Sequence, residues 1–397
     1  MINTAHLKNI LFFFAILLFF FIPISESGKE IALISLVISS FFIPGFINQL
    51  IRVIKEPWCI AVVGLLLLVL FSCFWSPAIL HYKLLVMKRY SKFLYLPFLV
   101  IAFRYAQVQR QTIHAFLFAM SIVSLFIMLK AYGFVHLKPN TEIDTVFLNH
   151  IITSMMMSFA AYLSAYFFIE CYRERRGYPV LWTIATLYFS FQVLYFETGR
   201  TGHIMFLLLT LLIFIQFFNW KQICLGVIAL CVVLIGVYYS SSALKTGLND
   251  AVNNVYRFRH HDKNTSVGYR LQFHQYAYDI FKRHPIFGNG TAGLVSDYYQ
   301  TNPFPNFKTK LFHPHSEYWL ILADYGLVGL VLYLWFLTAF FLKRLTLRTL
   351  RPVANGIFLI ICVAGLSSST FFNAGGGLFY IAMLALCLSD EEKNEKI

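Results

Sequence analysis

Two histidines stand where a long polar segment gives way to an apolar run, in the sequence His313-Pro-His-Ser316. A neutral imidazole can accept a proton from a hydroxyl group, as a general base does, and chemistry alone leaves His313 and His315 both eligible. A histidine that makes only a local hydrogen bond at a helix start is an equally good interpretation. Glu317 could orient the base, whereas Asp324, on the same helix face, is expected to pack inside a bundle. Ionisable groups beside an apolar run are costly to keep unless they are used, so this stretch is the first candidate site.

Two arginines are candidates for binding an anion. In Thr198-Gly-Arg-Thr-Gly202, the glycines around Arg200 allow a tight turn whose N–H groups can surround phosphate oxygens. The guanidinium can then bind those oxygens through paired hydrogen bonds. Arg270 lies near the start of an expected helix, where backbone N–H groups also favour anions. Taken singly, Arg200 could instead be a lipid headgroup anchor and Arg270 a member of an ordinary salt bridge, and Glu317 could pair with either.

The composition is that of an integral membrane protein. Apolar residues make up 59% of the chain and charged residues 13%, about half the charged share of a soluble domain. The apolar runs have the length of transmembrane helices rather than of barrel strands. The net charge of +14 comes from basic residues scattered among these runs, which favours membrane lipids and anionic lipid-linked substrates over nucleic acid. The seven cysteines show no metal-binding spacing, so neither a disulfide framework nor a metal site is expected.

The chain is expected to be an all-α polytopic membrane protein with about twelve transmembrane helices. Residues 1–240 would hold nine of them, 241–315 a large and partly helical loop, and 316–397 the last three with a cytoplasmic tail. The first run is interpreted as a retained span because no small-residue cleavage site follows it. The expected spans are roughly 9–24, 31–48, 58–75, 93–103, 112–131, 146–169, 180–195, 203–219, 222–240, 317–342, 353–368 and 371–388.

The distribution of Lys and Arg predicts the orientation. Alternate short connections are rich in basic residues, which assigns both termini to the cytoplasm. The Arg200 turn and the 241–315 loop are separated by two spans, so they lie on the same side, and the charge rule makes that side periplasmic. Segment 76–92, which includes Lys88 and Arg89, breaks the rule. It is either an amphipathic helix on the outer leaflet or a connector leading into the fourth span.

One helix is expected within the loop, from Ser266 to Pro285. Ser266 would cap its start and Pro285 would end it. Arg270 lies seven residues before Ala277 and should project from the apolar face that packs downward. The remainder of the loop, at Asn302-Pro-Phe-Pro-Asn306, is expected to be irregular and rich in aromatic residues. The apolar face of the helix is formed by Phe273, Tyr276, Ala277, Ile280 and Phe281.

Together these motifs resemble the O-antigen ligase and O-antigen polymerase superfamily of polytopic glycosyltransferases. His315-Ser316, then nine residues, then Gly326-Leu-Val-Gly329 is similar to the ligase pattern. The Arg200 turn resembles the family's Ser-Arg-(Ser/Thr)-Gly turn, although Gly199 replaces the serine that often precedes the arginine. The segment Ser266–Gly290 resembles the helix and turn of the family's large periplasmic loop.

The resemblance implies a GT-C-like fold in the bacterial inner membrane and a specific division of labour among residues. Arg200 and Arg270 would bind the pyrophosphate of an undecaprenyl-pyrophosphate-linked glycan donor, and His315 would activate a hydroxyl of the lipid A-core acceptor. Supporting roles are left open for His313, Glu317, Lys88 and Arg89.

The expected reaction is O-antigen ligation in lipopolysaccharide biosynthesis, without a cofactor. Direct attack predicts inversion, and the lack of an acidic pair in the outer loops predicts independence from metal ions. The alternatives are an O-antigen polymerase and an O-linked protein oligosaccharyltransferase. A lipid-linked glycan transporter is a more distant alternative, because ionisable groups cluster at one face and no internal repeat is visible.

Overall fold

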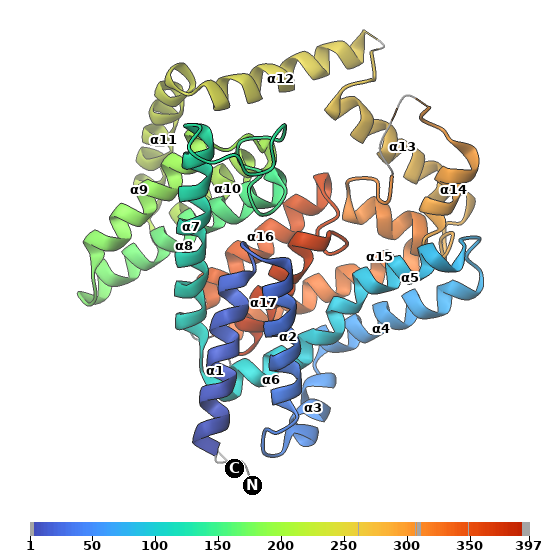
Figure 1. Ribbon diagram of the computed structural model, residues 1–397, viewed down its shortest axis with the longest axis horizontal. Helices are drawn as coiled ribbons and strands as arrows, with labels where there is room; N and C mark the ends of the chain where they lie inside the picture. The colour runs from blue at the N-terminus through green and yellow to red at the C-terminus, as the bar shows by residue number, and fades with distance from the viewer. Residues whose placement is uncertain (1–3, 261, 306, 308–310, 348, 391–397) are drawn as a thin grey trace.

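The computed structural model describes residues 4–260, 262–305, 307, 311–347 and 349–390. The described chain is built from helices and connecting turns (Figure 1). The helices before the long loop are α1 (Thr4–Phe21), α2 (Glu26–Ser40), α3 (Phe46–Ile54), α4 (Pro57–Phe71), η1 (Ser72–Phe74), α5 (Leu80–Tyr90), η2 (Ser91–Leu94), α6 (Tyr95–Ala106), α7 (Gln109–Ala131), α8 (His150–Glu174), α9 (Pro179–Tyr195), α10 (Arg200–Phe217) and α11 (Trp220–Ser240). Those of the loop and the C-terminal part are α12 (Ser242–Arg259), α13 (Ser266–Arg283), α14 (Gly293–Thr301), α15 (Glu317–Lys343), η3 (Arg344–Thr346), α16 (Arg351–Ser367) and α17 (Ala374–Leu388).

The fold is that of a multi-pass membrane protein, but the expected count of twelve spans is not confirmed. Each expected span contains a helix, yet seven helices of the described chain are long and apolar enough to cross a membrane. They are α1, α4 with η1, α7, α8, α10, α11 and α15 with η3. Helices α9, α16 and α17 are apolar but shorter. Helix α2 begins with charged residues and α6 has only 12 residues, which explains why neither meets the requirement.

The connections between helices meet in two groups, at opposite ends of the bundle. In the first group, named here the site face, contacts join Lys29 with Gly375, Ser76 with Thr291, Thr198 with Asp144, and Arg200 with Ser266. In the second group, contacts join Tyr105 with Thr4, Arg110 with Glu170, Tyr166 with Thr349, and Lys343 with Glu56. These groups match the alternation of connections predicted from the sequence. The tail expected after Asp390 lies outside the described residues.

The loop 241–315 is more helical than expected. Helix α13 confirms the predicted amphipathic helix, with Phe273, Ala277 and Ile280 buried. The predicted cap is wrong by one residue, because the Thr265 side chain accepts the hydrogen bond from the Gly268 N–H. Helices α12 and α14 lie in parts of the loop for which no helix was predicted, and Figure 1 shows α12 running across the top of the view from α11 toward α13.

Helix α15 is interrupted at Gly326, whose backbone has φ 64° and ψ −157°. Positive φ with this ψ is accessible essentially to glycine alone. The turn after α13 fills the interruption, and a side chain at Gly326 would collide with the Ile286 carbonyl. Four backbone hydrogen bonds, named here the bracket, join the two segments: Asn289 N to Ala323 O, Gly290 N to Asp324 O, Leu327 N to Pro285 O, and Val328 N to Ile286 O.

Asp324 belongs to the same junction. Its side chain is buried, and Oδ1 accepts a hydrogen bond of 2.8 Å from the Leu294 N–H in the first turn of α14. A carboxylate beside a helix N-terminus accepts a hydrogen bond from a free N–H group and is stabilised by the positive end of the helix dipole. Asp324 therefore has a structural role inside the bundle, as the sequence suggested. Together with the bracket, it fixes the loop helices to α15.

Candidate functional site

Arg200 is the first residue of α10 and follows Gly199, which caps the helix without a side chain. Gly199 and Gly202 both face Ser154 of α8 so closely that a side chain at either position would collide with it. The guanidinium donates through Nη2 to Ser266 Oγ at 3.3 Å. Its Nη1 is buried and has no hydrogen-bond partner among the described residues. The turn therefore presents a fixed cation with a free donor.

The Arg200 turn is anchored by an acidic residue that the sequence analysis did not identify. Asp144, in the connection between α7 and α8, is fully buried. Its carboxylate accepts hydrogen bonds from Thr198 N at 2.9 Å and from Thr198 Oγ1 at 2.7 Å. Glu197 is also fully buried, and burial together with the charge of Asp144 raises its pKa well above its ordinary value. Burial therefore favours the neutral, protonated form of Glu197, and Asp144 is the acid that is hydrogen-bonded to the turn.

Arg270 is the second cation and lies beside Arg200. Its half-buried guanidinium forms no hydrogen bond or ion pair with any described residue. Burial lowers its pKa, and repulsion from the nearby positive charge of Arg200 lowers it further. Arginine stays charged even so. Two neighbouring cations with free donors form an electrostatically unfavourable arrangement that a bound anion would relieve.

His315 lies next to this arginine pair. Its backbone adopts φ 56°, in the left-handed region, although it is not a glycine. The Phe273 ring stacks on its imidazole with centroids 6.0 Å apart, and a ring nitrogen of His274 hydrogen-bonds the His315 backbone. Burial lowers the pKa of His315 to about 4, assisted by the charge of Arg270. The imidazole is therefore neutral near pH 7, as a proton acceptor must be.

His313 supports the unusual backbone of His315. The His315 N–H donates to His313 Nδ1 at 3.3 Å, and the two ring centroids are 4.7 Å apart. Burial lowers the pKa of His313 to about 3. One nitrogen of His313 is thus occupied by the backbone of its neighbour. This arrangement favours His315 as the base and His313 as the residue that orients it.

Glu317 forms no hydrogen bond with either histidine or with Arg200 or Arg270, the partners considered from the sequence. It is fully buried, and its carboxylate accepts hydrogen bonds from the Tyr90 hydroxyl at 3.3 Å and from the Phe371 N–H at 3.2 Å. These contacts tie the start of α15 to α5 and to the segment before α17. Glu317 therefore has a visible structural role at the rim of the site.

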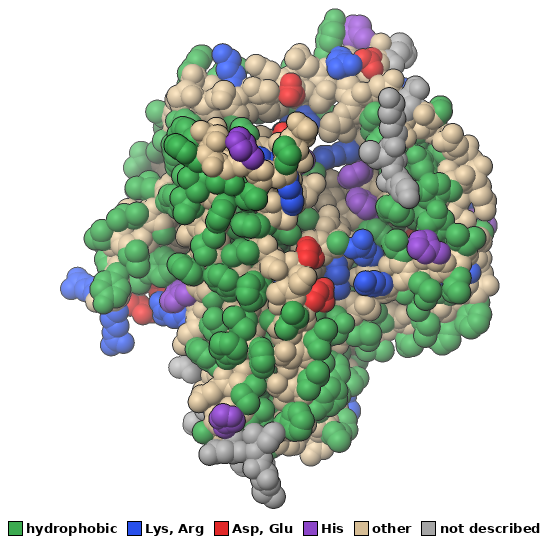
Figure 2. Space-filling view, in the orientation of Figure 1, with side chains coloured by type: hydrophobic (Ala, Val, Ile, Leu, Met, Phe, Trp, Pro, Cys, Tyr) green, Lys and Arg blue, Asp and Glu red, His purple; other side chains and the backbone are tan. Residues whose placement is uncertain are grey.

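Lys88 and Arg89 differ in their environments. Lys88 is exposed, whereas Arg89 is half-buried and its charge contributes to the lowered pKa of His313. Figure 2 shows Lys, Arg and His side chains gathered in the middle of the drawn face, with acidic side chains next to them. Among the described residues, no group of three or more His, Cys, Asp or Glu side chains is arranged to hold a metal ion.

Three contacts of the site were not predicted from the sequence. Ser266 meets Arg200, His274 meets the backbone of His315, and Asp144 holds the turn. His274 follows Arg270 by one helical turn, so the helix periodicity could have found it. Asp144 stands in a connection with no motif, and only the tertiary contact identifies it.

The family model described as O-antigen ligase matches residues 185–334. The matched region contains Arg200, Arg270, His315 and both glycines of the Gly326–Gly329 motif. It ends before α16 and begins after Asp144 and Arg89. None of the curated proteins matches the chain at a significant level.

Proposed function

Because residues 185–334 belong to the O-antigen ligase family, we propose that this multi-pass membrane protein is itself an O-antigen ligase. The family implies a glycosyltransferase-type reaction between a lipid-linked glycan and an acceptor. Our proposal is finer: the donor is O-antigen polysaccharide on undecaprenyl pyrophosphate, and the acceptor is a hydroxyl of lipid A-core oligosaccharide. The reaction would occur on the periplasmic face of the bacterial inner membrane.

The observation that supports this proposal is the arrangement of Arg200, Arg270 and His315. The two guanidiniums offer free N–H donors beside each other, which suits the two phosphates of a departing pyrophosphate. The neutral imidazole lies next to Arg270, which suits a hydroxyl that must lose its proton near the leaving group.

The proposed step is a single displacement. The acceptor oxygen attacks the anomeric carbon of the donor while the bond from that carbon to the pyrophosphate oxygen breaks. The hydroxyl proton passes to His315, and undecaprenyl pyrophosphate leaves with the bonding electrons. Attack from the face opposite the leaving group inverts the anomeric carbon. The arginines neutralise the charge that develops on pyrophosphate, and this is why we propose that no metal ion is required.

The neutral state of His315 has a further consequence for the complex. In the free site, Arg270 lowers the basicity of His315. A bound pyrophosphate would supply negative charge next to the same arginine and oppose that effect. Donor binding would therefore make His315 a stronger base at the moment when a base is needed.

The test is reconstitution of the purified protein with undecaprenyl-pyrophosphate-linked glycan and lipid A-core. We expect glycan on the core, with the anomeric configuration inverted and with no loss of activity in excess chelator. Arg200→Lys and Arg270→Lys should each transfer poorly, because a point charge does not replace the planar guanidinium. Growth of carrier-linked glycan without core acceptor would instead identify a polymerase, and transfer to protein hydroxyls an oligosaccharyltransferase.

A further inference from the structure

We propose that Arg89 binds an anionic group of the acceptor, a phosphate or a carboxylate, on the side of the histidine pair opposite the donor arginines. This inference rests on the proposed function, since it assigns the second substrate of the same site. It adds a third arginine, from a part of the chain outside the family match, to the residues that contact substrate.

Contacts between rings connect the end of α5, where Arg89 lies, to His313. His313 packs against Phe372 with ring centroids 5.6 Å apart, and Tyr90, the neighbour of Arg89, packs against the same ring at 6.2 Å. The charges of Arg89 and Arg270 both act on His313, whereas of these two arginines only Arg270 acts on His315. Arg89 therefore lies on the His313 side of the histidine pair.

Arg89 is a half-buried cation that lacks a partner of its own. It forms no hydrogen bond or ion pair with any residue that the structure describes. The nearest acidic influence is Glu26, whose carboxylate already pairs with Lys29 at 2.8 Å. A guanidinium withdrawn from water without a partner is unfavourable, so a ligand that supplies oxygens there would be bound strongly.

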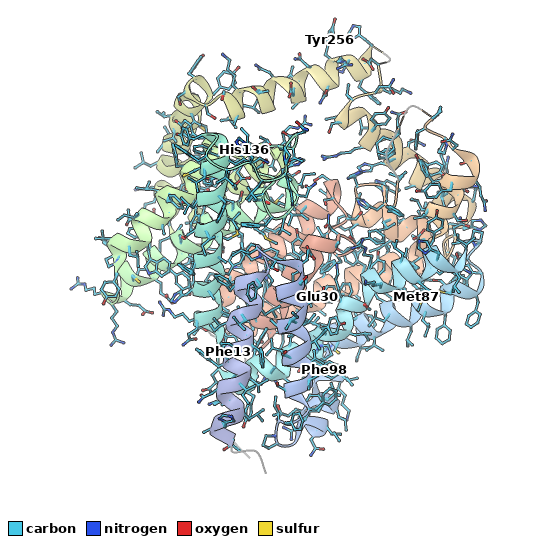
Figure 3. All side chains as sticks on the ribbon, in the orientation of Figure 1. Phe13, Glu30, Met87, Phe98, His136 and Tyr256 are labelled. Carbon is cyan, nitrogen blue, oxygen red and sulfur yellow. The ribbon has the colours of Figure 1, made fainter. Side chains whose placement is uncertain are left out.

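Two neighbouring lysines make the surroundings of Arg89 more positive and so more favourable for an anion. Lys92 donates to the Asn373 carbonyl at 2.6 Å, so it too has no carboxylate bonded to it. Burial, together with the charges of Arg89 and Lys29, lowers the pKa of Lys92 to about 8. Against these three cations stand Glu26 and Glu30, and the latter is labelled on α2 in Figure 3. Neither acid forms an ion pair with Arg89 or Lys92 among the described residues.

The position of Arg89 relative to the histidines indicates which of the two substrates it would bind. In a direct displacement the acceptor oxygen attacks the anomeric carbon from the side opposite the departing pyrophosphate, and the base lies within hydrogen-bond reach of that oxygen. The donor pyrophosphate is assigned to Arg200 and Arg270, on one side of His315. The acceptor must then approach from the other side, where His313 and Arg89 lie.

The experiment measures donor and acceptor kinetics separately for the full-length protein in proteoliposomes. The variants are Arg89→Ala and the matched control Lys88→Ala, which removes the neighbouring but exposed cation. Intact lipid A-core and the same material dephosphorylated with hydrofluoric acid serve as acceptors. We expect Arg89→Ala to raise the acceptor KM by about tenfold or more, in line with the loss of one charge-assisted pair. Its donor KM should stay close to that of the wild type. Lys88→Ala should leave both KM values close to those of the wild type.

The outcomes separate this inference from the proposed function. A penalty for Arg89→Ala that disappears with dephosphorylated acceptor assigns a phosphate, and one that persists assigns a carboxylate. An unchanged acceptor KM, or a rise in the donor KM instead, overturns the acceptor site while leaving ligation intact. Absence of transfer to core by the wild type overturns the proposed function itself.

Discussion

At the scale of single residues, the most unusual feature is a histidine with left-handed backbone. His315 has φ 56°, and for a residue with a side chain this conformation costs about 1 kcal/mol or more. The surroundings hold it there: His313 accepts from its N–H, and Ser316 begins α15 by accepting from the Trp319 N–H. Strain that neighbouring groups enforce is typical of residues placed for chemistry.

The two histidines should therefore respond differently to substitution. We expect His315→Ala to lower the rate of transfer by about 10²–10⁴-fold, the usual contribution of a general base. His313→Ala should cost less, since it removes support rather than the proton acceptor. Turnover under saturating donor and acceptor, with membrane insertion checked by detergent extraction, decides between them. A larger loss for His313→Ala would reverse the assignment.

The pH dependence of transfer tests the same residue. His315 acts when it is neutral, and its pKa of about 4 in the free site means that activity is lost only as the pH falls below that region. We expect kcat/KM, which reports the free enzyme, to stay level from about pH 8 to about pH 5. The acid limb of kcat should lie at higher pH, because bound pyrophosphate favours the protonated imidazole. An acid limb of kcat/KM near the ordinary histidine value of 6.5 would contradict the burial of His315.

At the scale of elements, two junctions hold the arginines. The turn at Arg200 depends on Asp144 from a distant connection, and Arg270 depends on α13, which the bracket fixes to α15. Neither arginine sits on a free loop. The site is thus formed where two groups of helices meet.

The Asp144 junction predicts opposite outcomes for its two acids. Asp144→Ala leaves the half-buried N–H and hydroxyl of Thr198 without their acceptor, at a cost of about 1 kcal/mol for each group, and should lower kcat/KM at least tenfold by loosening Arg200. Glu197→Gln should stay near the wild type, because an amide resembles the protonated acid. Transfer rates and melting temperatures in detergent check both. Equal losses in the two variants would mean that Glu197 is ionised.

The bracket predicts a large effect for one small substitution. Gly326→Ala forces a side chain into the left-handed region and against the Ile286 carbonyl, so we expect a lower melting temperature and little folded protein. Gly236→Ala on α11 is the matched control, since a side chain there meets no atom within 4 Å. Thermal unfolding in detergent compares the two. Similar stability for both would show that the interruption of α15 is dispensable.

At the scale of the whole molecule, the two groups of connections define two faces. The orientation of these faces in the membrane is predicted from basic residues alone and can be measured. With Cys224 and Cys231, the exposed native cysteines, replaced by serine, an impermeant thiol reagent on spheroplasts should label Lys263→Cys and leave Arg175→Cys unlabelled until permeabilisation. Labelling of Arg175→Cys alone would invert the orientation, and labelling of both would contradict the two faces.

Much of this arrangement follows from local pattern in the sequence. Apolar periodicity predicted α13, and the pattern of spans predicted that Arg200, Arg270 and His315 share one face. Helix α12 was missed because Gly247 and its many polar residues hide any apolar stripe. The interruption at Gly326 was missed because glycine spacing does not reveal which backbone will pair with it. Asp144 and Arg89 could not be assigned, since their roles arise from contacts between segments far apart in the chain.

The bracket has a mechanical consequence for the arginine pair. The bracket fixes α13, which carries Arg270, to α15, whereas the glycines on either side of Arg200 pack on Ser154 of α8. Repulsion between the two guanidiniums pushes these two groups of helices apart, and an anion bridging both would pull them together. The distance between the two guanidiniums should therefore be shorter when a dianionic pyrophosphate is bound than in the free protein.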